Sequence, residues 1–250
     1  MFLYLNENLK KEYNKACVFF RQQLNANGKA AKARAYLEKR GIDKDLVETF
    51  SIGWCPPDAK IWDKFEQLKG MLIFPIKDWT GEILAFSGRL PVDKENIKDG
   101  EKRWWNESYN KSFFFYGLDV ALKHILERDF VIIVEGQTDV ISCHRFGLKN
   151  TIGLMSKDLS KKHLVKLTRL TLNYVLMLDG DLVGRKAAIK TKEEITSRKL
   201  PGDEKGVSYR VADVNLNVKG QGFDPDELLK RYGAKPIVAS IKRQGVFANK

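Results

Sequence analysis

The spacing of apolar residues predicts three helices at the start of the chain. Between Tyr13 and Leu24, apolar side chains recur every three or four positions, as on one face of an amphipathic helix. A second helix is expected from Lys29 to Arg40, ended by Gly41, which can adopt the left-handed conformation common after helices. Asp43 can accept a hydrogen bond from the first turn of a third helix and is expected to begin it.

After residue 70 the pattern changes to strand-length apolar runs. Met71–Ile76 and Glu82–Phe86 are expected to form two strands joined by a turn at Asp78–Gly81. Phe130–Val134 and Tyr174–Leu178 are further runs of strand length. The helices expected to alternate with these later strands are Asp139–Phe146, Leu159–Leu170 and Arg185–Arg198. The alternation predicts an α/β fold, in which an α+β subdomain precedes a βαβ parallel-sheet domain.

Acidic residues follow both strands of the predicted parallel sheet. The carboxyl ends of parallel strands meet at one edge of a sheet, where crevices for ligands form. Side chains two positions apart in an extended segment point to the same side, so an Asp-x-Asp pair can present both carboxylates to one point. The acids in question are Glu135, Asp139, Asp179, Asp181, and a later pair with the same spacing, Asp224 and Asp226.

Crowded carboxylates repel one another unless cations lie among them. Oxygen ligands of this kind suit magnesium, and phosphoryl transfer is the reaction class in which such metals commonly act. Each of the three acidic segments, taken alone, also has an ordinary structural interpretation. Asp179-Gly180 is also a favoured turn dipeptide. Glu135–Asp139 could simply begin a helix, and Asp224 could cap a helix starting at Pro225.

Charge and composition point to a polyanionic partner. The 250 residues include 44 Lys and Arg against 32 Asp and Glu, a net charge of +12. An acidic pocket on an otherwise basic protein suits a nucleic acid. No apolar run reaches membrane-span length and no secretory signal is evident, so a cytoplasmic location is expected. The three cysteines are scattered singly and predict neither a zinc module nor a disulfide framework.

Aromatic residues interleave with cations at Arg103–Asn106 and again at Phe113–Tyr116. Aromatic faces combined with basic groups hold single-stranded nucleic acids by stacking and phosphate pairing. Aromatic side chains in strands also commonly belong to a core. We favour the core interpretation for Phe113–Phe115 and leave both open for Trp104 and Trp105.

Three motifs together resemble the Toprim domain of bacterial DnaG-type DNA primases. They are Val134-Glu135-Gly136-x-x-Asp139-Val140, Asp179-Gly180-Asp181-x-x-Gly184-x-x-Ala187-Ala188 and Asp224-Pro225-Asp226-Glu227. Upstream segments resemble the catalytic-core subdomain of the same primases, and these are Tyr36–Ile42, Phe50–Trp54, Phe74–Ile76 and Phe86–Arg89. The resemblance extends roughly from Leu9 to Gly233. It implies a primase-core subdomain over residues 1–125, a Toprim-like domain over 126–233, and a tail or short helix over 234–250.

The resemblance implies synthesis of short RNA primers from ribonucleoside triphosphates on single-stranded DNA. The catalytic residues would be Glu135, Asp139, Asp179 and Asp181, and the ligands of Mg²⁺ or Mn²⁺ would be Glu135, Asp179, Asp181, Asp224 and Asp226. Template or nucleotide would be bound by Arg89, Lys102, Arg103, Trp104 and Asn106. Expected partners are a replicative helicase and a zinc-binding module on another chain, and so short a primase would suit a compact genome such as a phage's, acting in the host cytoplasm.

The chain departs from the primase pattern at two points. A lysine that primases carry before a Leu-Tyr-Gly segment has only Lys111 as a weak substitute ahead of Tyr116. A Gly-Thr pair between the acidic motifs is replaced by Leu154–Asp158. Two other classes therefore stay open, a Toprim nuclease or topoisomerase-like phosphodiester enzyme and a non-catalytic single-stranded-DNA-binding replication subunit.

Overall fold

The computed structural model describes residues 6–26, 28, 30–97, 100, 102–109, 111–156, 159–197 and 209–245. Two compact units divide between Tyr109 and Asn110. This division falls before the expected domain boundary at residue 125, because the helix spanning that boundary packs into the second core. Within the described ranges, no helix has both the length and the apolar character needed to cross a bilayer.

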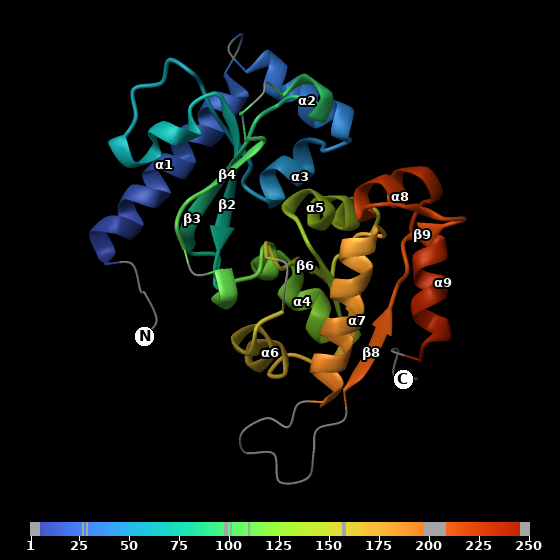
Figure 1. Cartoon of the computed structure of the whole chain (residues 1–250). Helices are drawn as coiled ribbons and strands as arrows, with labels where there is room; N and C mark the ends of the chain where they lie inside the picture. The colour runs from blue at the N-terminus through green and yellow to red at the C-terminus, as the bar shows by residue number, and fades with distance from the viewer. Residues whose placement is uncertain are drawn as a thin grey trace. The chain divides into compact units, whose positions relative to one another are not determined.

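The first unit packs three helices with a four-stranded antiparallel sheet (Figure 1). The helices are α1 (Glu7–Asn25), α2 (Ala31–Arg40) and α3 (Lys44–Thr49), and short 3₁₀ turns lie at Asp63–Leu68 and Lys94–Asn96. The strands, in spatial order, are β1 (Gly53–Cys55), β2 (Met71–Lys77), β3 (Ile83–Arg89) and β4 (Trp104–Asn106). A cluster of buried aromatic rings from α1, β3 and the first 3₁₀ turn forms much of the core: Tyr13, Phe20, Phe65 and Phe86.

The local signals in this unit are confirmed. Gly41 ends α2 with φ of 70°, in the left-handed region. The Asp43 carboxylate accepts the backbone N–H of Leu46 at 2.9 Å and begins α3. The turn between β2 and β3 is held by Asp78, whose carboxylate accepts the backbone N–H of Thr80 at 2.8 Å. Lys29, the expected start of α2, lies outside the described residues.

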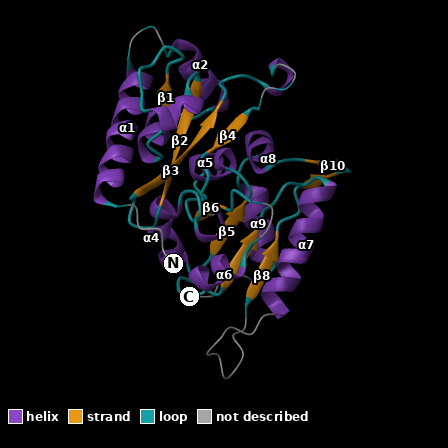
Figure 2. Ribbon diagram, turned by 60° about the vertical axis from the view of Figure 1, so that its left-hand side comes forward, coloured by secondary structure: helices purple, strands orange, loops and turns teal. Residues whose placement is uncertain are grey.

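The second unit is built on a parallel sheet whose spatial order is β6-β5-β7-β8 (Figure 2). The strands are β5 (Val131–Val134), β6 (Thr151–Gly153), β7 (Asn173–Leu176) and β8 (Arg210–Asp213). The helices are α4 (Leu118–Arg128), α5 (Gln137–Arg145), α6 (Lys161–Leu167), α7 (Leu182–Ser197), α8 (Pro225–Tyr232) and α9 (Lys235–Arg243). A 3₁₀ turn at Lys111–Phe113 precedes α4, and a two-stranded hairpin, β9 (Asn217–Val218) and β10 (Gln221–Gly222), precedes α8.

The order of these strands creates a switch point at the centre of the sheet. From β5 the chain moves outward through α5 to β6, and it then returns through α6 to β7 on the other side of β5. In open α/β sheets, the crevice at such a reversal, past the carboxyl ends of the strands, is where ligands bind. In this sheet the reversal lies between β5 and β7. The predicted parallel βαβ fold is confirmed.

Candidate active site

The ends of β5 and β7 bring the first two predicted acids together. Glu135 follows β5, and its Oε1 accepts the backbone N–H of Asp179, which follows β7, at 3.2 Å. The backbone carbonyl of Glu135 in turn accepts the N–H of Met155 at 2.8 Å. The loops after three neighbouring strands, β6, β5 and β7, therefore fix one another's positions through their main chains.

Asp139 serves both as part of a helix start and as a member of the acidic cluster. Its Oδ2 accepts the N–H of Gly136 at 3.1 Å, in the first turn of α5. The side chain is only 8% exposed. Burial first, and then the charges of Asp224, Asp179 and Asp226, raise the pKa of Asp139 well above its ordinary value. Asp139 therefore lies within electrostatic reach of the other two acidic motifs.

Asp181, two residues after Asp179, lies just before α7 and caps its first turn. Its Oδ1 accepts the N–H of Gly184 at 2.7 Å, and its carbonyl accepts the N–H of Arg185 at 2.9 Å. A Cβ on Gly184 would lie 2.2 Å from the carbonyl oxygen of Asp179. Glycine is required at this position because the first turn of α7 lies against the loop that carries the acids.

The hairpin of β9 and β10 places the third acidic motif beside that loop. Gly180 donates its N–H to the carbonyl of Phe223 at 2.8 Å. A Cβ on Gly222 would lie 2.5 Å from the Gly180 carbonyl oxygen, and a Cβ on Gly180 would lie 2.6 Å from that of Leu216. The two segments are thus in direct backbone contact, and Asp224 follows immediately.

Asp224 and Asp226 begin α8. Asp224 Oδ1 accepts the N–H of Glu227 at 2.7 Å, which confirms its predicted role as a helix cap. Asp226 is buried and pairs with Lys230, one turn further along, at 2.7 Å. The structure therefore combines two of the readings left open by the sequence. Asp139, Asp181 and Asp224 each stabilise a helix start, and they do so within one cluster.

Asp179 is the member of the cluster whose carboxylate is least satisfied. Among the described residues, its Oδ1 is buried and has no hydrogen-bond partner. Burial, followed by the charges of Glu135 and Asp224, raises the pKa of Asp179 to about 7. A cation beside this oxygen would give Oδ1 a partner. It would also lower the pKa of Asp179, because it favours the ionised carboxylate.

The donor atoms of the acidic cluster fit a hard divalent cation. The cluster offers carboxylate oxygens only, which suit Mg²⁺ or Mn²⁺. Over the described residues, no group of three or more His, Cys, Asp and Glu side chains has the arrangement of a metal site. The acids of the expected ligand set share one electrostatic environment, and their role as metal ligands stays a prediction.

The predicted nucleic-acid residues lie on strands β3 and β4 of the first unit. Arg89 pairs in register with Trp104. Its guanidinium carbon lies 4.9 Å from the Trp104 ring centroid and 5.5 Å from that of Tyr36. Arg89 is only 2% exposed, and burial lowers its pKa. Arg89 is thus enclosed by two rings, and its expected contact with a template stays a prediction.

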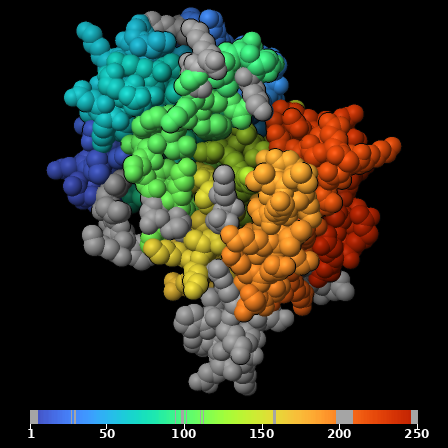
Figure 3. Space-filling view, viewed as in Figure 1, coloured from blue at the N-terminus to red at the C-terminus, as the bar shows by residue number. Residues whose placement is uncertain are grey.

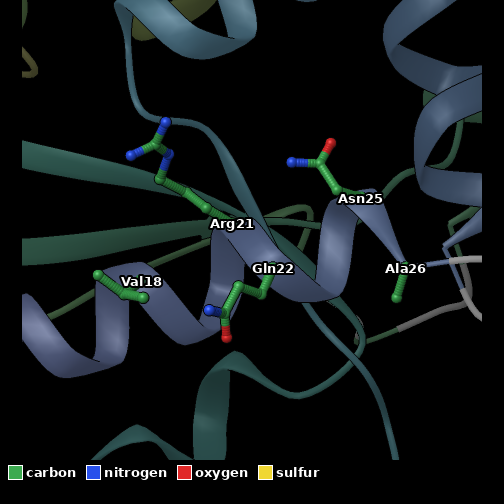
Figure 4. Close-up of a pocket in the computed structure, with 5 residues that line it drawn as sticks. All are labelled: Val18, Arg21, Gln22, Asn25 and Ala26. Carbon is green, nitrogen blue, oxygen red and sulfur yellow. The ribbon is translucent and has the colours of Figure 1, made fainter.

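The remaining residues of this predicted set are more accessible. Lys102 is exposed, and Arg103 and Trp104 are partly exposed. The Asn106 side chain accepts a short hydrogen bond from the Ser87 hydroxyl, which ties β4 to β3. Figure 3 shows the part of this unit's surface that faces the viewer, coloured by residue number. Arg103 and Lys102 are thus the cations of the set that can reach a phosphate without rearrangement.

The structure also places the residues of three weaker expectations, as far as it describes them. Phe115 is buried in the core of the second unit, whereas Phe113 and Phe114 are half-buried, with Lys162 lying 4.0 Å from the Phe113 ring centroid. The main-chain carbonyl of Lys111 contacts His163 Nε2 at 2.8 Å. In the loop that replaces the primases' Gly-Thr pair, Lys157 and Asp158 lie outside the described residues.

Sequence reasoning missed two features that hold the site. Arg185 and Asp213 form a two-bond ion pair, each bond 2.8 Å long, between α7 and the end of β8. Gly222 provides the backbone contact described above. The Gly-x-Gly spacing just before Asp224 was a signal for close backbone packing, but no sequence feature indicated that Asp213 would meet Arg185.

Family comparisons match both units. Residues 132–229 match the family model described as Toprim-like, and residues 19–71 match that of the DNA primase catalytic core, N-terminal domain. A DNA primase from Staphylococcus epidermidis is 30% identical over 212 residues, which cover 83% of this chain and 32% of that protein. The chain thus spans about a third of the length of this curated relative.

Solved structures with the same fold include a DNA primase domain from Pseudomonas aeruginosa, with a TM-score of 0.74 and 26% identity, covering 92% of this chain and 77% of that one. The DnaG primase catalytic domain bound to ssDNA has a TM-score of 0.76 and 23% identity, covering 94% and 78%. The two family matches, the sequence relatives and the fold together support a DnaG-type primase core for this chain.

Proposed function

We propose that this chain synthesises short RNA primers, joining ribonucleoside triphosphates on a single-stranded DNA template during DNA replication. The observation that carries the proposal is the acidic cluster at the switch point between β5 and β7, in which Glu135, Asp139 and Asp179 lie beside the Asp224 motif. The family matches support the reaction class, and a catalytic domain with the same fold is described as bound to ssDNA.

The acids would divide the work of nucleotidyl transfer. Asp179, Asp181, Asp224 and Asp226, with Glu135, would hold Mg²⁺ or Mn²⁺, which supplies charge neutralisation for the triphosphate and activation of the attacking hydroxyl. Glu135 is the candidate acceptor of the proton from that 3′-hydroxyl, since it lies at the end of the central strand and is held by the Asp179 N–H. Asp139 would complete the acidic surface from a buried position, where a bound cation would favour its ionised form.

Binding of the template falls to the first unit in this proposal. Lys102 and Arg103 would contact phosphates, and Trp104 would offer a ring face to a base. Asn106 would act from its position on the edge strand. Arg89 would support Trp104 from beneath in this arrangement. A replicative helicase and a zinc-binding module on another chain are proposed as partners from the resemblance alone.

Primer synthesis with purified protein tests the proposal. The protein is incubated with single-stranded DNA, labelled ribonucleoside triphosphates and Mg²⁺ or Mn²⁺, with and without a separate zinc-module protein. We expect labelled oligoribonucleotides. Nicked DNA would indicate the nuclease class, and DNA binding without products would indicate a non-catalytic subunit.

Asp179→Ala is the matched loss-of-function variant. It should abolish synthesis while single-stranded DNA binding stays nearly intact, because the acid serves the reaction and not the template. Glu193→Ala, which removes one exposed carboxylate from α7, serves as the control and should remain active. Primer synthesis by folded Asp179→Ala protein would contradict the assignment of the acidic cluster.

A further inference from the structure

The start of α7 exposes apolar side chains directly beside the acidic cluster. Leu182 and Val183 are 81% and 67% exposed, the highest values among the large apolar residues that the structure describes. They follow Asp181, whose carboxylate caps the helix. A third large apolar residue of α7, Ile189, is 51% exposed. Isolated exposed apolar residues are ordinary, but three on one helix beside a candidate reaction centre form a surface.

Helical geometry places these residues in one stripe together with basic residues. Positions seven apart lie on the same face after two turns, so Ile189 lies in line with Leu182, and Lys190 in line with Val183. The exposed Lys186 lies between them. We call this surface the α7 stripe: Leu182, Val183, Lys186, Ile189 and Lys190. Figure 3 shows α7, in orange, on the face turned to the viewer.

The order of residues along the α7 stripe suits a nucleic acid that extends from the acidic cluster along the helix. The residues next to the carboxylates, Leu182 and Val183, are apolar. A lysine at either position would compete with cations for the acids that are proposed to hold them. One turn further the stripe gains its first lysine, Lys186, and Lys190 follows beside Ile189, so that a phosphate backbone could be paired there. Apolar side chains can pack against sugars and base edges, while phosphate contacts position the strand.

Charge favours a nucleic acid, rather than a second copy of the chain, as the ligand of the α7 stripe. A symmetric contact through the stripe would bring Lys186 and Lys190 of one molecule close to the same lysines of another, whereas a nucleic acid would set them against phosphate. The net charge of +12 acts in the same direction. Neither Leu182 nor Val183 contributes to the core of the second unit.

We propose that the α7 stripe is the docking surface for the RNA–DNA hybrid formed at the acidic cluster. Leu182 and Val183 pack against the sugars and base edges of the terminal pairs, and Lys186 and Lys190 contact the backbone beyond them. The proposal deepens the proposed function and rests on it for the identity of the hybrid.

Binding of a preformed hybrid tests the stripe without requiring catalysis. A short fluorescein-labelled RNA–DNA hybrid and the same DNA as a single strand are titrated with the full chain, and anisotropy is followed at fixed salt and Mg²⁺. The double variant Leu182→Ser/Val183→Ser should bind the hybrid about tenfold more weakly and the single strand within about twofold of wild type. Far-UV circular dichroism and thermal melting check that the variant is folded.

Leu126→Ser is the matched control, since Leu126 is a 55% exposed leucine on α4. It should leave hybrid binding unchanged. Unchanged hybrid affinity in the double variant, an equal loss in Leu126→Ser, or a hybrid that binds no more tightly than the single strand each overturns the proposal. Self-association of the wild type that the double variant loses would assign the stripe to a second copy instead.

The two proposals fail in different ways. If the wild type makes no primers but its hybrid affinity depends on Leu182 and Val183, the polymerase proposal fails and the docking surface stands. If the wild type makes primers and the double variant binds hybrid normally, the polymerase stands and the docking surface fails.

Discussion

The electrostatic cost of crowding carboxylates in the acidic cluster is clearest at one residue, Asp179. It lies at the sheet's switch point, its main chain is bound by Glu135, and its Oδ1 is buried without a partner among the described residues. Its pKa is raised to about 7 by burial and neighbouring carboxylates. In the metal-free protein, ionisation of this group therefore opposes folding.

This shift predicts a pH dependence of stability. A carboxyl whose folded pKa exceeds its unfolded value near 4 contributes fully below the unfolded value, and its contribution is lost as pH rises through about 7. Wild-type protein in chelator should lose about 2 kcal/mol more unfolding free energy than Asp179→Asn between pH 5 and 8, after allowance for solvent screening of a partly exposed group. Urea titrations at both pH values measure this.

The same experiment with Mg²⁺ separates the charge effect from other causes. At pH 8, Mg²⁺ should restore stability to the wild type and have little effect on Asp179→Asn, because the asparagine offers no charge to the cation. If the unfolding free energies of the two proteins change with pH in parallel, both with and without Mg²⁺, the pKa of Asp179 is not raised in the folded protein. Glu193→Gln provides the control for loss of one exposed carboxylate.

Arg89 and Arg103 allow a second test at the scale of single residues. The resemblance assigns both to template or nucleotide, and loss of a phosphate contact should reduce the slope of log affinity against log salt by about one. The structure buries Arg89 between Tyr36 and Trp104, so we expect Arg103→Met to reduce the slope and Arg89→Met to leave it unchanged while weakening base stacking. A reduced slope for Arg89→Met would mean that Arg89 leaves the stack to contact DNA.

At the scale of elements, the site depends on two backbone segments in direct contact. The loop from Asp179 to Gly184 lies against the end of the β9–β10 hairpin, and neither Gly180 nor Gly222 has room for a Cβ. This contact is what brings Asp224 to the carboxyl end of β7. It also explains why residues more than 40 positions apart can act together.

Gly222→Ala tests that contact. The added methyl group would lie 2.5 Å from the Gly180 carbonyl, so the hairpin must shift. We expect a loss of about 2 kcal/mol in unfolding free energy and at least a tenfold loss of primer synthesis. Gly220→Asn is the control, since Gly220 has φ of 86° with open space around it, and asparagine tolerates the left-handed region. Similar losses in both variants would indicate that the hairpin is merely sensitive to substitution.

The sequence predicted those elements whose signals are local. The caps at Asp43 and Asp224 and the glycine end at Gly41 depend on a few neighbouring residues, and all three are confirmed. The strand order, the hairpin contact and the burial of Arg89 depend on residues distant in sequence, so local patterns could not reveal them. Helix α4 was not predicted, although its buried residues, Leu118, Ala121 and Ile125, recur at helical spacing.

At the scale of the whole molecule, two opposite charge distributions coexist. The net charge is +12, yet six carboxylates are concentrated at one sheet edge. The remaining surface is correspondingly more basic. Phosphates should therefore be attracted to much of the protein, while the acidic cluster admits a triphosphate only when cations accompany it.

This arrangement predicts different ionic responses for the two ligands. Raising monovalent salt from about 50 to 200 mM should weaken single-stranded DNA binding by about a hundredfold if about five phosphates are contacted. At fixed ionic strength, adding Mg²⁺ should strengthen ribonucleoside triphosphate binding, because the cation neutralises both the triphosphate and the acids. Asp179→Asn should lose most of the Mg²⁺ effect and keep the salt slope for DNA. Anisotropy with labelled DNA and with a labelled nucleotide measures both, and loss of the DNA slope in Asp179→Asn would show that template and triphosphate share one binding region.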